Sequence, residues 1–151
     1  MVKDTKFKRP ESVLVVIYNP VAEVLVMRRR EPDDFWQSVT GSLREGEVAD
    51  ACACREVMEE TAINPPGIIN HHTSWTFPIL PAWRARYAPE VTENREHVFS
   101  LCVEQGVIPT LNEREHTEYQ WLPFQQAVER VSSYTNRDAI LMLANEQGWP
   151  Q

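Results

Sequence analysis

The chain has 151 residues, of which 42% are hydrophobic and 25% charged, and its formal net charge is -7. This length suits one hydrophobic core, so we expect a single domain over residues 1–151. The acidic balance argues against a nucleic-acid polymer as partner, because such binding depends on a basic surface. Phosphorylated small molecules remain possible substrates, since a metal site itself requires carboxylates.

The sequence also bears on the compartment. No apolar run approaches the roughly 20 residues of a membrane helix, and the polar start Met1–Pro10 lacks the apolar stretch of a signal peptide. Cys52, Cys54 and Cys102 form an odd set without a paired spacing, which indicates a reducing environment. We therefore expect a cytoplasmic protein without a membrane partner.

The first half of the chain predicts strands followed by a helix. Ser12–Tyr18 is nearly all apolar and β-branched, as in a strand buried on both faces. Asn19-Pro20 ends it, and Glu23–Arg28 is predicted as its hairpin partner. Phe35–Thr40 is a short extended segment. Val48–Thr61 contains neither Gly nor Pro and is rich in helix-forming residues, which predicts a helix.

The second half predicts further strands and two helices. The expected extended segments are Ile68–Phe77, His97–Val103 and Tyr119–Leu122, and the expected helices are Pro123–Val131 and Arg137–Gln147. Asn136 is the expected N-cap of the last helix. Because the helices follow strands, we predict an α/β (α+β) layered fold.

The helix predicted over Val48–Thr61 carries an unusual charge pattern. One arc of roughly 140° holds Arg55, Glu56, Glu59 and Glu60. The core-facing stripe is expected to be Ala51, Cys54, Val57 and Met58. Glutamates at these spacings repel one another, and Mg²⁺, which prefers oxygen ligands, would offset that repulsion. A solvated helix face is the plainer interpretation of the same pattern.

The segment Gly41–Ile63 resembles the Nudix box, whose pattern is G, five residues, E, seven residues, R-E-apolar-x-E-E-x-G-apolar. The fixed Gly, Glu and Arg positions filled in register are Gly41, Glu47, Arg55, Glu56, Glu59 and Glu60. A chance match at a given start has odds of about 10⁻⁷. Ala62 departs from the box, which has Gly there, and this predicts a slightly different exit from the helix.

The resemblance implies a Nudix fold, in which a mixed sheet lies between helices and the box forms a loop–helix–loop. It also implies hydrolysis of a diphosphate linkage with Mg²⁺, or with Mn²⁺. Glu56 and Glu60 would be the principal metal ligands, and Glu59 a ligand or a partner to them. Arg55 would orient a carboxylate through its guanidinium group.

Three further roles follow from the resemblance. Glu47 would hold the box, act on the metal indirectly or cap the helix, and Gly41 would allow a close backbone approach or an unusual φ. A general base outside the box has three candidates: Glu113, Glu115 and Glu118. We favour Glu115, also as a metal ligand, because it precedes the predicted strand Tyr119–Leu122.

Short motifs elsewhere resemble a subgroup of the family that releases diphosphate from a pterin triphosphate in folate synthesis. These motifs are Lys8-Arg9-Pro10, Arg29-Arg30, Asp34–Ser42, Arg86–Pro89 and Asn136-Arg137. The substrate-binding residues that this resemblance implies are Lys8, Arg29, Thr40, Phe77, Pro78, Ile79, Leu80 and Ser133. Lys8 and Arg29 would bind the triphosphate, Phe77 would stack on the ring, and Ser133 would lie in a loop that closes over it.

Plainer interpretations stand beside these roles. Arg29 is also typical of a surface charge and Phe77 of a core residue, while Trp36 and Trp75 are expected in the core. The four histidines have no metal-ligand spacing, so no zinc site is predicted. Two other functions stay open: a Nudix enzyme for nucleoside triphosphates or dinucleoside polyphosphates, and a noncatalytic nucleotide-binding module on the same fold.

Overall fold

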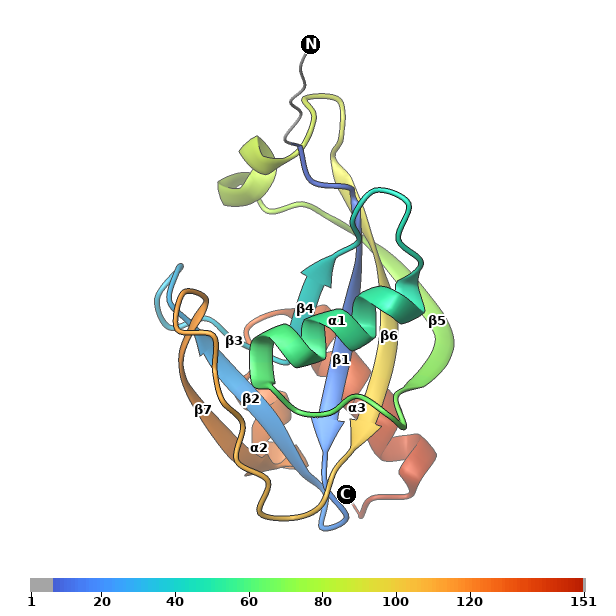
Figure 1. The fold of residues 1–151 in the computed structure, drawn as a ribbon, viewed down its shortest axis with the longest axis vertical. Coiled ribbons are helices and arrows are strands. Elements are labelled where there is room, and N and C mark those ends of the chain that lie inside the picture. The colour runs from blue at the N-terminus through green and yellow to red at the C-terminus, as the bar shows by residue number, and fades with distance from the viewer. Residues whose placement is uncertain (1–6, 151) are drawn as a thin grey trace.

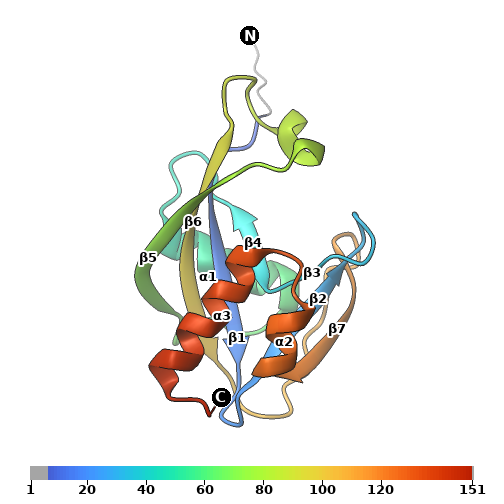
Figure 2. The same ribbon diagram turned by 180° about the vertical axis from the view of Figure 1, so that it is seen from behind.

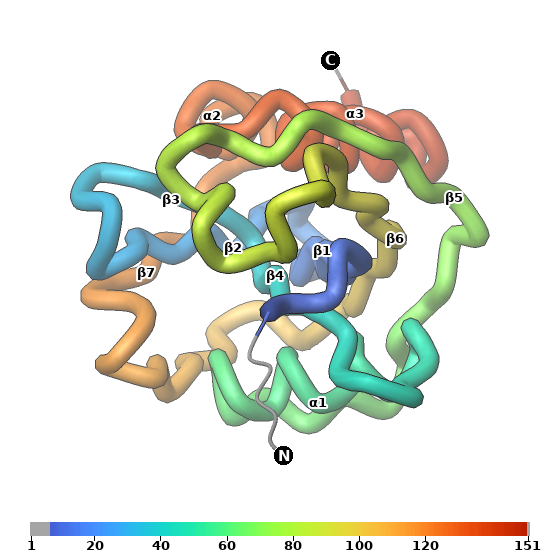
Figure 3. The backbone as a smooth tube through the Cα atoms, turned by 90° about the horizontal axis from the view of Figure 1, so that it is seen from above, coloured from blue at the N-terminus to red at the C-terminus, as the bar shows by residue number. Residues whose placement is uncertain are grey.

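The computed structural model describes residues 7–150, and a mixed seven-stranded sheet forms its centre. The strands are β1 (Glu11–Tyr18), β2 (Glu23–Arg29), β3 (Trp36–Gln37), β4 (Val39–Ser42), β5 (Ile69–Pro78), β6 (Glu93–Cys102) and β7 (His116–Pro123). The helices are α1 (Ala49–Thr61), the 3-10 helix η1 (Pro81–Arg86), α2 (Phe124–Arg130) and α3 (Tyr134–Gln147). α1 covers one face of the sheet, and α2 and α3 cover the other (Figures 1, 2 and 3). This is the layered fold predicted from the sequence.

β1 is buried on both faces, as its apolar run predicts. Successive side chains of a strand point to opposite faces. Val13, Val15 and Ile17 therefore join the core under α1, and Leu14 and Val16 join the core under α2 and α3. One strand thus contributes to two hydrophobic cores.

The sheet divides beside β1. β1 pairs with β6 in parallel along its whole length. On its other edge it pairs with β4 from Ser12 to Val15, and with β2 only where Tyr18 faces Val24. β2 diverges to pair with β7 and β3. We call this divergence, between β4 on one side and β2 with β3 on the other, the fork (Figure 1).

The fork corrects the predicted hairpin between Ser12–Tyr18 and Glu23–Arg28. The two strands are consecutive, but they pair only at their closed end, because β4 takes the edge of β1 beyond that point. The last helix also differs from the prediction. It begins at Tyr134, and its N-cap is Ser133, whose side chain accepts a hydrogen bond from the Asn136 backbone amide.

The rotation of α1 differs from the expected core stripe. Ala51 and Met58 are exposed and Cys54 is only half-buried, so of that stripe Val57 alone is fully buried. The buried residues of α1 are instead Cys52, Ala53, Glu56, Val57, Glu60 and Thr61. The helix therefore turns part of its acidic arc toward the sheet, where the small side chains of Cys52 and Ala53 permit a close approach.

The domain boundaries and the membrane expectation are addressed only by the described residues. The single domain over residues 1–151 stays a prediction, because residues 1–6 and 151 lie outside the described part of the chain. Within the described part, each helix is too short or too polar to cross a lipid bilayer.

Candidate active site

A cavity of about 720 Å³ lies at the fork, a volume typical of small-molecule sites. The predicted site residues that line it are Lys8, Arg29, Thr40, Gly41, Arg55, Glu56, Glu59, Phe77, Pro78, Ile79, Leu80, Glu115 and Ser133. The two remaining predicted residues, Glu47 and Glu60, do not line it. Glu47 contacts the lining residue Arg55, and Glu60 contacts Glu56. The chain between β5 and β6, which includes η1, passes over the end of the sheet here (Figure 3).

Gly41 brings β4 close to α1. A Cβ atom at this position would overlap the carboxylate of Glu56, so no larger residue fits without moving that side chain. Gly41 is absent from the glycines with positive φ, and the close approach alone therefore explains the glycine. It lets a helical carboxylate rest directly on the backbone of a strand.

Arg55 connects the carboxylates of the box. Its Nε and Nη2 donate to the two carboxylate oxygens of Glu47, at 2.8 Å each, in a bidentate pair. Hydrogen bonding from Arg55 is the main reason that the pKa of Glu47 falls to about 2. Arg55 Nη1 lies 3.1 Å from Glu56 and 3.3 Å from Glu59. Glu47 also accepts from the Arg44 amide, so it secures the loop and aims Arg55 at the other two carboxylates.

Glu60 is a buried carboxyl group of the site that lacks a full set of hydrogen-bond partners. It is 1% exposed, and its Oε1 has no hydrogen-bond partner among the described residues. Burial raises the pKa of Glu60 well above its ordinary value, and the charges of Glu56 and Glu115 add to the rise. Burial also raises the pKa of Glu56. A buried carboxylate cluster of this kind is costly unless a cation offsets its charge.

His116 was missed in the sequence because its neighbours in the site come from distant elements. One ligand atom each of Glu60, Glu115 and His116 lie within 4.8 Å of one another. His116 is buried, and its Nε2 lies 3.1 Å from Gln37 Nε2, while its Nδ1 has no partner among the described residues. Burial is the main cause that lowers the pKa of His116 to about 4, so the ring is neutral at pH 7. The pairing of β7 with β2 brings it here.

Basic side chains gather near these carboxylates. Burial, followed by the charges of Arg86 and Arg29, lowers the pKa of Lys8. Burial, followed by the charge of Arg86, likewise lowers the pKa of Arg29. The Arg29 guanidinium is held by the Glu31 carbonyl at 2.6 Å and by the Trp83 ring at 5.5 Å. Mutually repelling cations in a cavity favour an anionic ligand, and Arg86 was not predicted as one of them.

The remaining wall is more apolar. Ile79 is buried, Phe77 is half-buried and Leu80 is 50% exposed. Pro78 and Thr40 complete the predicted lining on this side. The cavity therefore joins a charged end, suited to phosphates and a cation, to an end suited to a flat ring.

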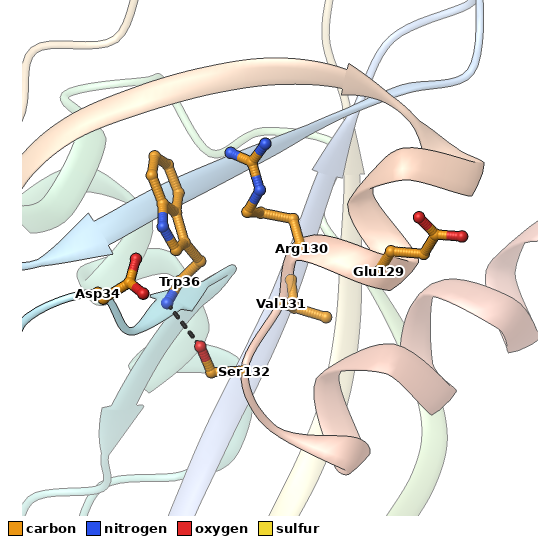
Figure 4. Close-up of a pocket in the computed structure, with 6 residues that line it drawn as sticks. All are labelled: Asp34, Trp36, Glu129, Arg130, Val131 and Ser132. Carbon is orange, nitrogen blue, oxygen red and sulfur yellow. Dashed lines mark hydrogen bonds between the residues drawn. The ribbon is translucent and has the colours of Figure 1, made fainter.

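The turn before α3 contacts the segment around β3. The backbone amide of Trp36 donates to Ser132 Oγ at 2.9 Å, and the Arg130 guanidinium lies 5.0 Å from the Trp36 ring centre (Figure 4). Asn136 is buried, and its side chain accepts a hydrogen bond from the backbone amide of Ser38 and donates one to Ser38 Oγ, between β3 and β4. Ser133 lines the cavity as the N-cap of α3, and the closing loop stays a prediction.

Comparison with known proteins agrees with this geometry. A family model described as the NUDIX domain matches residues 8–143, and the chain belongs to the Nudix family. It is 43% identical over 145 residues to dihydroneopterin triphosphate diphosphatase of Escherichia coli (strain K12), covering 91% of this chain and 94% of that protein. The enzyme of that name from Haemophilus influenzae is 38% identical over 140 residues, covering 89% and 87%.

A solved structure extends the likeness to three dimensions. The structure of the E. coli dihydroneopterin triphosphate pyrophosphohydrolase matches with a TM-score of 0.86 and 40% identity, covering 91% of this chain and 97% of that chain. The predictions of the family and of its fold are confirmed.

Proposed function

We propose that this chain hydrolyses dihydroneopterin triphosphate to dihydroneopterin monophosphate and diphosphate in folate synthesis. The observation that carries the proposal is the single cavity that joins buried carboxylates and basic side chains to an apolar wall. The similarity to enzymes named for this substrate supports it. The cytoplasm is the proposed compartment, since the three cysteines are all free thiols, which persist in reducing compartments.

Glu56, Glu60 and Glu115 are the proposed ligands of a divalent cation. The unpartnered Glu60 oxygen and the raised pKa of both box carboxylates fit this role, because each would gain an opposite charge. Carboxylate oxygens suit Mg²⁺ and also Mn²⁺. Such an ion would offset charge on the phosphates and acidify bound water.

The other charged residues would position the reactants. Lys8 and Arg29 bind the triphosphate, Arg55 holds Glu56 in place, and Glu47 holds Arg55. Glu59, exposed and shared between Arg44 and Arg55, lies at the edge of the cavity as a further ligand or partner.

Glu115 is the proposed general base. Glu118 is paired with Arg28 at 3.1 Å, and neither it nor Glu113 lines the cavity, whereas Glu115 does. Water attacks the phosphorus next to the pterin side chain, and Glu115 accepts its proton. The bond to the bridging oxygen breaks, and diphosphate departs with the electron pair.

The ring end of the substrate would contact the apolar wall. Phe77, Pro78, Ile79 and Leu80 enclose the ring, and Thr40 and Ser133 offer hydroxyl groups near the sheet and α3. Stacking of Phe77 on a flat heterocycle is favourable because both surfaces are aromatic.

A substrate panel tests the proposal. Dihydroneopterin triphosphate, dATP and diadenosine tetraphosphate are compared by kcat/KM with Mg²⁺, with the products identified and a chelator as control. We expect the pterin substrate to give the highest value and the chelator to abolish turnover. A preference for dATP or the dinucleotide would favour another Nudix activity, and binding without turnover would favour a noncatalytic module.

A further inference from the structure

A cluster of buried polar side chains lines the sheet side of the cavity, away from the carboxylates of α1. Glu96 and Asn94 lie on β6 and are 5% and 3% exposed. Trp75 Nε1 donates to Glu96 Oε1 at 2.9 Å, and Thr135 also hydrogen-bonds to this carboxylate. Asn94 Nδ2 donates to Ser12 Oγ at 2.8 Å. The reaction proposed above uses none of these groups.

This cluster has acceptor capacity left over. Asn94 Oδ1 is buried without a hydrogen-bond partner among the described residues. The donors to Glu96 are a neutral indole and a hydroxyl, and no cationic side chain is paired with it among the described residues. A carboxylate offers about four acceptor positions, of which these two donors use half. Buried acceptors without donors cost free energy, so the cluster is arranged for a ligand rather than for stability.

The strand register gives the distance from the cluster to the phosphate end. Ser12 of β1 pairs with Ser42 of β4 on one side and with Glu96 of β6 on the other. Glu96 is therefore two strand spacings, about 10 Å, from the strand that carries Gly41 and touches Glu56. The side chain of Glu96 lies on the α3 face of the sheet, like that of Val98, so a substrate would extend through the cavity from this face to the carboxylates of α1.

We propose that Glu96 and Asn94 recognise the 2-amino-4-oxo edge of the substrate ring. This edge presents a ring N–H beside an exocyclic NH₂, so two parallel hydrogens meet one carboxylate, as in an arginine–carboxylate pair. The second hydrogen of the NH₂ group is donated to Asn94 Oδ1. Guanine has the same edge, whereas adenine places an unprotonated ring nitrogen beside its NH₂ and repels the carboxylate. The proposal deepens the proposed function, because it assigns the ring subsite of the same cavity.

The test compares substrates in Glu96→Gln. Gln keeps the shape but turns a donor toward the ring N–H. We expect kcat/KM for dihydroneopterin triphosphate to fall about 100-fold, mainly through KM, since losing a polar match of this kind is strongly discriminating. Turnover of dATP should change less than about threefold, while dGTP should fall with the pterin substrate. Glu93→Gln, an exposed carboxylate on the same strand, is the matched control and should leave all three unchanged.

Neopterin, which has the ring but no phosphate, separates this inference from the proposed function. It should inhibit dATP hydrolysis by the wild type, and about tenfold more weakly in Glu96→Gln. Equal inhibition of both proteins would overturn ring recognition while leaving the proposed function standing. Selective inhibition by neopterin without turnover of the pterin triphosphate would support ring recognition and overturn the proposed function.

A second variant tests the inference even if Glu96→Gln fails to fold. Asn94→Leu removes the unpartnered oxygen and should show the same selective loss of pterin turnover. If the folded variants lost dATP and pterin turnover equally, the cluster would be structural and the inference overturned.

Discussion

Helices α1 and α3 cover opposite faces of the same sheet but differ in composition and capping. The inner face of α3 is nearly all small or apolar and includes Ala139, Ile140, Leu143 and Ala144. Ser133 caps its start with a side-chain hydrogen bond, and Gly148 ends it in the left-handed conformation. The inner face of α1 includes Glu56 and Glu60, and its N-cap residue makes no side-chain hydrogen bond.

The two helices serve different purposes: α3 stabilises the fold, and α1 carries the proposed catalytic groups. Apolar burial and good caps stabilise α3. Buried carboxylates without full pairing destabilise α1 in the absence of a cation, because a charge loses its hydration on burial. The fold tolerates the destabilising carboxylates of α1 because the two hydrophobic cores, one on each face of the sheet, supply the stabilising free energy.

The largest expected effect is on catalysis, from Glu60→Gln in α1. Because the substitution removes a proposed ligand charge, kcat should fall by roughly 1,000-fold or more. The fold should survive, since Gln fills the same space and still donates to Glu56. Steady-state kinetics with Mg²⁺, together with circular dichroism, check both parts. An unfolded variant would contradict the separation of the two roles.

A cavity-forming substitution in α3 should have the opposite effect: it should lower stability and leave kcat unchanged. Leu143→Ala removes a side chain that is 1% exposed, so the free energy of unfolding should fall by about 3 kcal/mol. Urea denaturation measures this loss. The kcat per folded molecule should stay within about twofold of the wild type, because α3 supplies no proposed catalytic group. A loss of kcat as large as that from Glu60→Gln would contradict the assignment of α3 to stability.

Gly41→Ala tests the close contact between β4 and α1. The added methyl group would displace the carboxylate of Glu56, so kcat should fall by about 100-fold through misplacement alone. Kinetics and the concentration of Mg²⁺ needed for half-maximal activity measure the effect. Unchanged kinetics would mean that Glu56 does not depend on this contact.

Without a metal ion, the charge of Glu60 should also lower the free energy of unfolding. Its pKa is raised above 4.5 on folding, so the folded chain binds a proton more readily and stability falls as pH rises through that window. In a chelator, Glu60→Gln should therefore gain about 2 kcal/mol at neutral pH, and less toward pH 5. Comparing the two proteins at each pH cancels the titrations of groups distant from Glu60. A gain that grew at low pH would refute this account.

The smallest effect concerns the end of α1. Ala62 has φ 58° and ψ 16°, the left-handed conformation that the box glycine would adopt without strain. Alanine is strained in this conformation, and the difference in the helix exit stays a prediction. Ala62→Gly should raise stability by about 1 kcal/mol, or about 2–4 °C in Tm, as measured by thermal unfolding with kcat unchanged. A lower Tm would mean that loss of chain entropy outweighs the relief.

The sequence predicted those features that depend on local spacing. The carboxylates of α1 share a face because helical geometry sets their relative angles. Glu47 lies just before the start of α1, eight residues from Arg55. The absolute rotation of α1 was wrong because helical periodicity does not say which side meets a sheet when both sides carry small residues. His116 and Glu96 were missed because strand pairing with β2 and β1 brings His116 beside Glu60 and Glu115, and Glu96 to the cavity. Such register is set by contacts distant in sequence.

The fork has a consequence for how this protein changes over evolutionary time. Because the strands separate beside β1, the two ends of the cavity are built by different elements, and α1 shares no residue with β6. If β6 recognises the ring as proposed, mutations on β6 and the start of α3 change which ring is accepted without altering the hydrolytic machinery. In this architecture, substrate preference can therefore change while the reaction stays the same.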